Sequence, residues 1–145
     1  MFGTIVLGFD ESQHAERASR KAVELAKALG DKVVVVHVQP LVNPGRGGPM
    51  PSEEPDAAHH VLDAGVAPFL AAGVDATGQL QRGPVDRVGE LLIEVAKSVG
   101  AGLIVIGTRG RSDTQSMLFG SVAHHVIHHS ETPVLVVRDT DSHPH

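Results

Sequence analysis

The chain has 145 residues, the usual length of one domain, and can bury a core without disulfides or metal ions. It has no cysteine, which excludes disulfides, thiolate metal sites and cysteine nucleophiles. A net charge of −5, without a block of lysine or arginine, argues against nucleic acid and anionic membranes as partners.

The first elements alternate between strand and helix. Residues 4–9 form a short apolar run that predicts a buried strand. Ser12 is placed to cap a helix whose apolar residues recur at helical spacing until Gly30 ends it. Residues 32–38 contain four consecutive valines, a pattern typical of a central strand of a parallel sheet.

The middle of the chain is less regular. Residues 39–56 lack periodicity and are rich in proline and glycine, so a mobile loop or lid is expected there. A helix over about residues 54–72 is plausible, with Gly65 and Pro68 expected to kink or shorten it. Residues 74–81 alternate weakly and predict a third strand near the edge of a sheet.

The last third returns to a clear pattern. Pro84 stands at a helix-start position, and an apolar stripe continues to Gly100. Residues 103–106 predict the fourth strand and residues 133–138 the fifth, with a helix between them that opens at Gly120. Five strands alternating with helices predict one α/β domain over residues 1–145: a sandwich with a parallel sheet and right-handed crossovers. Residues 139–145 are expected to be a short disordered tail.

Glycines at fixed offsets follow the predicted fourth strand. Two residues separate Gly107 from Gly110, and nine residues separate Gly110 from Gly120-Ser121, which opens the next helix. Glycine allows another group to approach the backbone, and a helix N-terminus presents free N–H groups and the positive end of its dipole. Strand, glycine loop and helix start together indicate a phosphate-binding site.

The spacing G-x2-G-x9-G-S resembles the nucleotide-binding signature of the universal stress protein family, and the resemblance covers nearly the whole chain. It implies a Rossmann-like sheet of order 3-2-1-4-5 with helices on both faces. It also implies that ATP binds, with Mg²⁺, between the ends of the first and fourth strands. Asp10 would contact the ribose or adenine side, and the backbone of Val38 the adenine edge. The glycine loop and helix start would hold ribose and phosphates. The nucleotide-binding residues so expected are Gly8, Phe9, Asp10, Val38, Ile106, Gly107, Arg109, Gly110, Gly120, Ser121 and Val122.

Four positions depart from the family's pattern: Phe9, Glu11, Gly102 and Ala123. Glu11 follows Asp10 where the family usually has glycine or a small residue, and it adds negative charge near the expected phosphates. Ala123 stands where many members carry a second hydroxyl.

No catalytic residue is predicted. The chain lacks a G-x-x-x-x-G-K-[ST] loop, and no base is evidently paired with a nucleophile. The resemblance therefore implies a nucleotide-dependent regulatory or protective module of the stress response, with slow hydrolysis at most. Two alternatives stay open: a slow ATPase or self-phosphorylating protein with Ser121 or Ser112 as acceptor, and a dimeric scaffold that no longer binds nucleotide. AMP or cyclic AMP also remains open as the ligand.

Four histidines, His124, His125, His128 and His129, form two i, i+4 pairs in the helix that opens at Gly120. Such pairs can chelate Zn²⁺ or Ni²⁺, but no carboxylate or cysteine in the segment completes a set of four ligands. A solvated helix face is expected, and no metal site is predicted.

The family resemblance also implies a homodimer joined through the last strand. Its residues Val134, Leu135, Val136 and Val137 would form an apolar edge, which a solitary protein normally protects. No apolar run reaches the length of a membrane span, and the first residues lack a basic, cleavable leader, so a cytoplasmic protein is expected.

Overall fold

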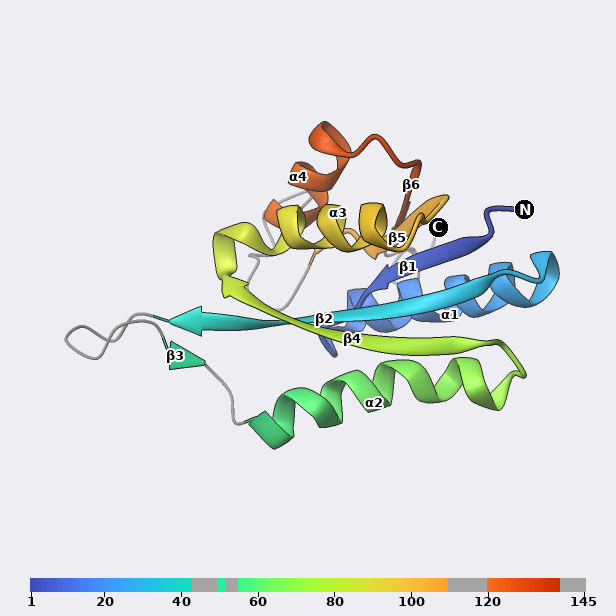
Figure 1. The fold of residues 1–145 in the computed structure, drawn as a ribbon, viewed down its shortest axis with the longest axis horizontal. Coiled ribbons are helices and arrows are strands. Elements are labelled where there is room, and N and C mark those ends of the chain that lie inside the picture. The colour runs from blue at the N-terminus through green and yellow to red at the C-terminus, as the bar shows by residue number, and fades with distance from the viewer. Residues whose placement is uncertain (43–49, 52–54, 110–119, 139–145) are drawn as a thin grey trace, which may run out of the picture.

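A twisted sheet with helices on both faces forms the centre of the molecule (Figure 1). The computed structural model describes residues 1–42, 50–51, 55–109 and 120–138. The elements, in chain order, are β1 (Thr4–Gly8), α1 (Gln13–Leu29), β2 (Lys32–Val42), β3 (Met50–Pro51), α2 (Pro55–Ala71), β4 (Ala76–Pro84), the 3₁₀ helix η1 (Val85–Arg87), α3 (Val88–Ser98), β5 (Leu103–Gly107), α4 (Ser121–His129) and β6 (Val134–Val137).

The five long strands run parallel in the order β4-β2-β1-β5-β6. This order confirms the predicted α/β domain with its 3-2-1-4-5 sheet. The short β3 adds an antiparallel pairing with Leu41 and Val42 at the end of β2. The strand order reverses between β1 and β5, so a crevice opens beyond their carboxyl ends.

Two apolar cores lie on the two faces of the sheet. Alternate residues of each strand point to opposite faces, so Ile5 and Leu7 pack under α1 and α2 while Val6 packs under α3 and α4. Burial on both faces explains the unbroken valine run of β2, because neither side of a central parallel strand meets water. The predicted helices on both faces are thereby confirmed (Figure 1).

Helix α1 begins and ends where its capping residues predict. Ser12 Oγ accepts a hydrogen bond from the Ala15 N–H at 3.1 Å, and Gly30 ends the helix in the left-handed conformation with φ 69°. The buried face of α1 consists of small residues: Ala15, Ala18, Ser19, Ala22 and Ala26. A face of small side chains lets the helix axis lie close to the sheet.

Two predicted boundaries are wrong: the end of the second strand, and the bounds of the third, which as β4 covers residues 76–84 and not 74–81. Residues 39–42 continue β2 and do not begin a loop, because β4 pairs beside β2 as far as Leu41. Gln39 is fully buried there, and its Oε1 accepts a hydrogen bond from Arg82 Nε at 2.9 Å. Pro84 ends β4 and is also the N-cap residue of η1, so a helical segment begins at the predicted position, and α3 follows from Val88. The remainder of the predicted loop, residues 43–49 and 52–54, and the predicted tail, residues 139–145, lie outside the described residues.

Helix α2 covers Pro55–Ala71, close to the predicted residues 54–72, and neither Gly65 nor Pro68 shortens it. Gly65 is where the helix backbone meets the sheet: a Cβ added there would lie 2.8 Å from the Phe9 ring and 2.9 Å from Val35. The glycine thus serves close packing within a continuous helix. Among the described helices, none is both long and apolar enough to cross a membrane.

Candidate functional site

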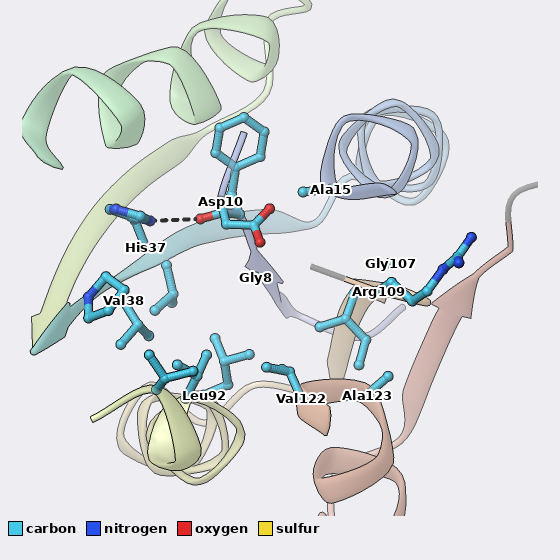
Figure 2. A pocket seen from close by; sticks show the side chains of 16 residues that line it. Gly8, Asp10, Ala15, His37, Val38, Leu92, Gly107, Arg109, Val122 and Ala123 are labelled. Atoms are coloured by element: carbon cyan, nitrogen blue, oxygen red, sulfur yellow. Dashed lines mark hydrogen bonds between the residues drawn. The ribbon is translucent and has the colours of Figure 1, made fainter. Parts of the chain in front are cut away.

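A pocket opens at the carboxyl ends of β1, β2 and β5, where the strand order reverses (Figure 2). It encloses about 140 Å³. A cavity of roughly 150 Å³ is enough to hold a benzene ring, so this one can take a single flat ring while larger parts of a ligand extend outward. Its lining residues are Gly8, Phe9, Asp10, Ala15, Val36, His37, Val38, Pro40, Val85, Val88, Leu92, Ile106, Gly107, Arg109, Val122 and Ala123.

One wall of the pocket is apolar. Val36 and Val38 come from the face of β2 that packs against α3, and Leu92 faces them from α3. Val122 closes this wall from the first turn of α4 (Figure 2). Aliphatic side chains on both sides favour a planar, weakly polar group between them.

The opposite lip of the pocket is the turn between β1 and α1. The Phe9 N–H donates to the Val36 carbonyl at 2.9 Å, which ties the turn to β2. Asp10 Oδ1 accepts a hydrogen bond from the Ser12 N–H at 3.0 Å, so the half-buried carboxylate is held in one orientation. Glu11 between them has φ 66°, the only left-handed conformation of a non-glycine residue in the described part of the chain. The turn therefore presents a fixed anionic acceptor to the pocket.

His37 of β2 holds this lip through the Phe9 carbonyl. Its ring is 1% exposed, and Nδ1 lies 3.0 Å from the Phe9 carbonyl oxygen. A carbonyl only accepts, so Nδ1 carries the hydrogen and donates. The bond fixes the peptide that precedes Asp10, as the dashed line in Figure 2 shows.

The two halves of the glycine motif meet in the structure. The Gly120 N–H donates to the Thr108 carbonyl at 2.6 Å, so the start of α4 lies directly beside the end of β5. Gly107 serves a packing role as well, because a Cβ added there would lie 2.6 Å from the His14 carbonyl oxygen of α1. Arg109 follows on the rim, and its side chain points away from the apolar wall in Figure 2.

Helix α4 begins beside the pocket without a side-chain cap. Gly120 is the N-cap residue, in an extended conformation with φ −70° and ψ 170°, and it has no side chain to occupy the first-turn N–H groups. Val122 and Ala123 face the pocket, whereas Ser121 is exposed and lines a neighbouring groove.

Most of the sequence-predicted site residues converge. Those that line the pocket are Gly8, Phe9, Asp10, Val38, Ile106, Gly107, Arg109 and Val122. Gly120 and Ser121 lie at the start of α4 without lining it, and Gly110 lies outside the described residues.

Eight lining residues were not among the predicted ones: Ala15, Val36, His37, Pro40, Val85, Val88, Leu92 and Ala123. Most are apolar residues at the ends of helices and strands. Their periodicity indicates only that they are buried, so no local pattern distinguishes a pocket wall from ordinary core.

The described residues contain no group of three or more histidine, aspartate or glutamate side chains arranged to hold a metal ion. The described lining of the pocket is an apolar slot with the Asp10 carboxylate, Arg109 and backbone amides at its edge.

Comparison with known proteins gives a consistent picture. The family model described as "Universal stress protein family" matches residues 1–138. A universal stress protein from Thermus aquaticus is 34% identical over 142 residues, which cover 95% of this chain and 100% of the relative. A solved universal stress protein from Archaeoglobus fulgidus, in complex with dAMP, superposes with a TM-score of 0.70 at 29% identity, covering 94% of this chain and 97% of the other. A universal stress protein in complex with cAMP gives the same TM-score at 28% identity, with the same coverage of both chains. The chain belongs to the universal stress protein family.

Proposed function

We propose that this chain binds an adenine nucleotide, ATP with Mg²⁺ being the expected ligand, and acts as a nucleotide-dependent regulatory or protective module of the stress response. The observation that carries the proposal is the pocket at the reversal of strand order, with its apolar slot beside a fixed carboxylate. The relatives solved with dAMP and cAMP support adenine nucleotides as the ligand class.

The pocket residues divide between the parts of a nucleotide. The base would lie in the slot between Val38 and Leu92, with the Val38 backbone at its polar edge. Asp10 would accept hydrogen bonds from ribose hydroxyls, because a carboxylate is an acceptor only. The phosphates would lie toward Gly107 and the uncapped N-terminus of α4, where N–H groups and the helix dipole favour an anion. Mg²⁺ would come bound to the phosphates.

The proposal is tested by identifying what the purified protein carries and what it binds. Nucleotide extracted from untreated protein is identified by mass spectrometry, and ATP with Mg²⁺, AMP and cyclic AMP are then titrated calorimetrically. We expect ATP to bind, with AMP and cyclic AMP reporting how much affinity the phosphates add. If no adenine nucleotide binds, the nucleotide proposal fails and the dimeric scaffold becomes the leading alternative.

Replacing Asp10 by Asn tests the ribose contact within the same experiment. Asparagine keeps an oxygen that can accept from the Ser12 N–H, so the turn is preserved while the charge is lost. A hydrogen bond to a charged group contributes about 1.5–3 kcal/mol, so affinity should fall by roughly tenfold or more. Asp63→Asn, on the exposed surface of α2, is the matched control and should bind as the unmodified chain does. Equal affinity for both variants would remove Asp10 from the site.

Slow hydrolysis or self-phosphorylation is the enzymatic alternative. The described lining of the pocket contains no lysine, serine or threonine, which argues for binding without rapid chemistry. Ser121 lies on the neighbouring groove, and Ser112 lies outside the described residues. Metal-dependent phosphate release that exceeds a Gly120→Val control would favour the enzymatic alternative.

We also propose that the chain forms a homodimer through β6. Within the described part of the chain, β6 pairs only with β5 and is the edge of the sheet, and its four apolar residues are all partly exposed. A second copy of β6 would satisfy the open backbone groups and cover the apolar side chains.

A further inference from the structure

The histidines of α4 are already paired in space. The ring centroids of His124 and His128 are 4.4 Å apart, and those of His125 and His129 are also 4.4 Å apart. His128 and His129 bring the two pairs beside each other at 6.4 Å. Three of the four residues are exposed, and His125 is half-buried. Each pair thus offers two imidazoles from successive turns of one helix to the solvent.

A carboxylate from a different part of the chain shares a groove with these pairs. The four histidines line a groove together with Ser121 and Asp86, the latter from η1. On α3, Gly89 packs against His125, since a Cβ added to the glycine would lie 3.0 Å from His125 Cβ.

We propose that α4 is a binding surface for a divalent transition metal ion such as Zn²⁺, in which each i, i+4 histidine pair is a bidentate imidazole site. Water completes the coordination, because the described side chains do not assemble three protein ligands around one point. This site is separate from the nucleotide pocket and does not depend on nucleotide binding.

The chemistry of the groove fits a borderline metal cation. Imidazole nitrogen is a preferred ligand of Zn²⁺, Ni²⁺ and Cu²⁺, whereas Mg²⁺ prefers oxygen. The second imidazole of a pair binds as an intramolecular ligand at high effective concentration, so a pair binds far more tightly than two separate histidines. The Asp86 carboxylate, which lines the same groove, favours a cation over an anion.

Two double variants separate pairing from the mere number of histidines. His124→Ala/His128→Ala leaves His125 and His129, an intact i, i+4 pair. His125→Ala/His128→Ala leaves His124 and His129, which are five residues apart and diverge around the helix. Both retain two histidines on α4, and histidines elsewhere, such as His59 and His60, stay in every protein compared. Each protein is stripped with a chelator and titrated calorimetrically with Zn²⁺ alone at slightly alkaline pH, without nucleotide.

We expect the unmodified chain and His124→Ala/His128→Ala to bind Zn²⁺ with similar affinity, and His125→Ala/His128→Ala to bind at least about tenfold more weakly. Added Zn²⁺ should raise Tm in the first two proteins and not in the third, because a ligand of the folded state stabilises it. Equal affinities in the two double variants would mean adventitious binding by histidine content and would overturn the proposal. Absence of binding to the unmodified chain would overturn it as well. His125 packs against Gly89, so His125→Gln/His128→Gln, which preserves side-chain bulk, is used if the alanine variant does not fold.

Discussion

At the scale of single residues, the turn after β1 shows how local strain positions the proposed site. Glu11 has φ 66°, a conformation that glycine adopts freely and other residues adopt at a cost of about 1–2 kcal/mol. The strain persists because hydrogen bonds on both sides, from the Phe9 N–H to Val36 and from the Ser12 N–H to Asp10, hold the turn. The conformation gives a physical reason why glycine suits this position better than glutamate.

Glu11→Gly should therefore stabilise the protein. Removal of the strain is offset in part by the greater freedom of glycine in the unfolded chain, about 0.4–1 kcal/mol, so the net gain should be on the order of 0.5–1 kcal/mol. Urea unfolding measures the difference. Glu11→Ala is the control: it removes the same charge but keeps the Cβ, and an equal gain in that variant would show that charge and not backbone strain is responsible.

At the scale of secondary-structure elements, the packing of α2 on the sheet depends on Gly65. The helix crosses the sheet where a Cβ would overlap the Phe9 ring and Val35. Phe9 also lines the pocket, so the placement of α2 and the shape of the pocket are linked through this ring.

Gly65→Ala should lower the free energy of unfolding by about 1 kcal/mol. Helix propensity alone favours alanine by about 1 kcal/mol, but overpacking a buried contact costs about 1–3 kcal/mol. Chemical denaturation of Gly65→Ala alone and in a Phe9→Leu background forms a double-mutant cycle. A stabilising effect of Gly65→Ala in the unmodified background would show that α2 does not lie this close to the sheet.

The ends of elements were harder to predict from the sequence than their existence. Ser12 and Gly30 marked the limits of α1 because capping is a contact between residues close in the chain. The carboxyl end of β2 was missed because residues 39–42 are strand only by pairing with β4 and β3. Such pairing leaves no trace in local periodicity.

At the scale of the whole molecule, Asp31 ties the first residues to the start of β2. Its nearly buried carboxylate accepts hydrogen bonds from the Met1 amino group at 2.8 Å, the Phe2 N–H at 3.0 Å and the Gly3 N–H at 3.1 Å. The hydrogen bond from the amino group is the main reason that the pKa of Asp31 lies below its ordinary value. The Phe2 and Gly3 amides lower it further, while burial opposes the shift.

The contribution of Asp31 to stability should depend on pH. A carboxyl whose pKa is lower in the folded state stabilises the fold above its unfolded pKa, and this stabilisation is lost as pH falls through the folded pKa. Asp31→Asn should therefore lower Tm near neutral pH, and the difference in Tm should close in acid. Thermal melts across this range test it, with Asp63→Asn as an exposed control. A difference in Tm that stays constant with pH would contradict the assigned role of the charge.

The proposed dimer can be tested at the backbone of β6. In a strand, the N–H and C=O groups of alternate residues point to opposite edges. The Pro133 carbonyl faces β5, because it accepts a hydrogen bond from the Ile104 N–H. The backbone N–H and C=O groups of Val136, three residues further on, therefore point to the open edge. Val136→Pro removes that donor and leaves the β5 ladder in place. Light scattering should show a monomer for Val136→Pro and a dimer for Val136→Ala, which keeps the N–H. A dimer in both variants would place the interface elsewhere.

The amino-acid sequence alone specified the α/β class, the alternation of strands and helices, and the glycine motif, because each depends on residues within a few turns or a few strand positions of one another. The family resemblance had grouped Asp10, Val38, Gly107 and Val122 into one expected site, and the tertiary structure places them around one pocket. Only the tertiary structure placed His37 against the Phe9 carbonyl. It alone set Asp86 in one groove with the α4 histidines, where the helix by itself offers no carboxylate. These neighbours are separated by many residues along the chain. Strand order and crossovers decide their contacts, and a local hydrophobic period carries no information about either.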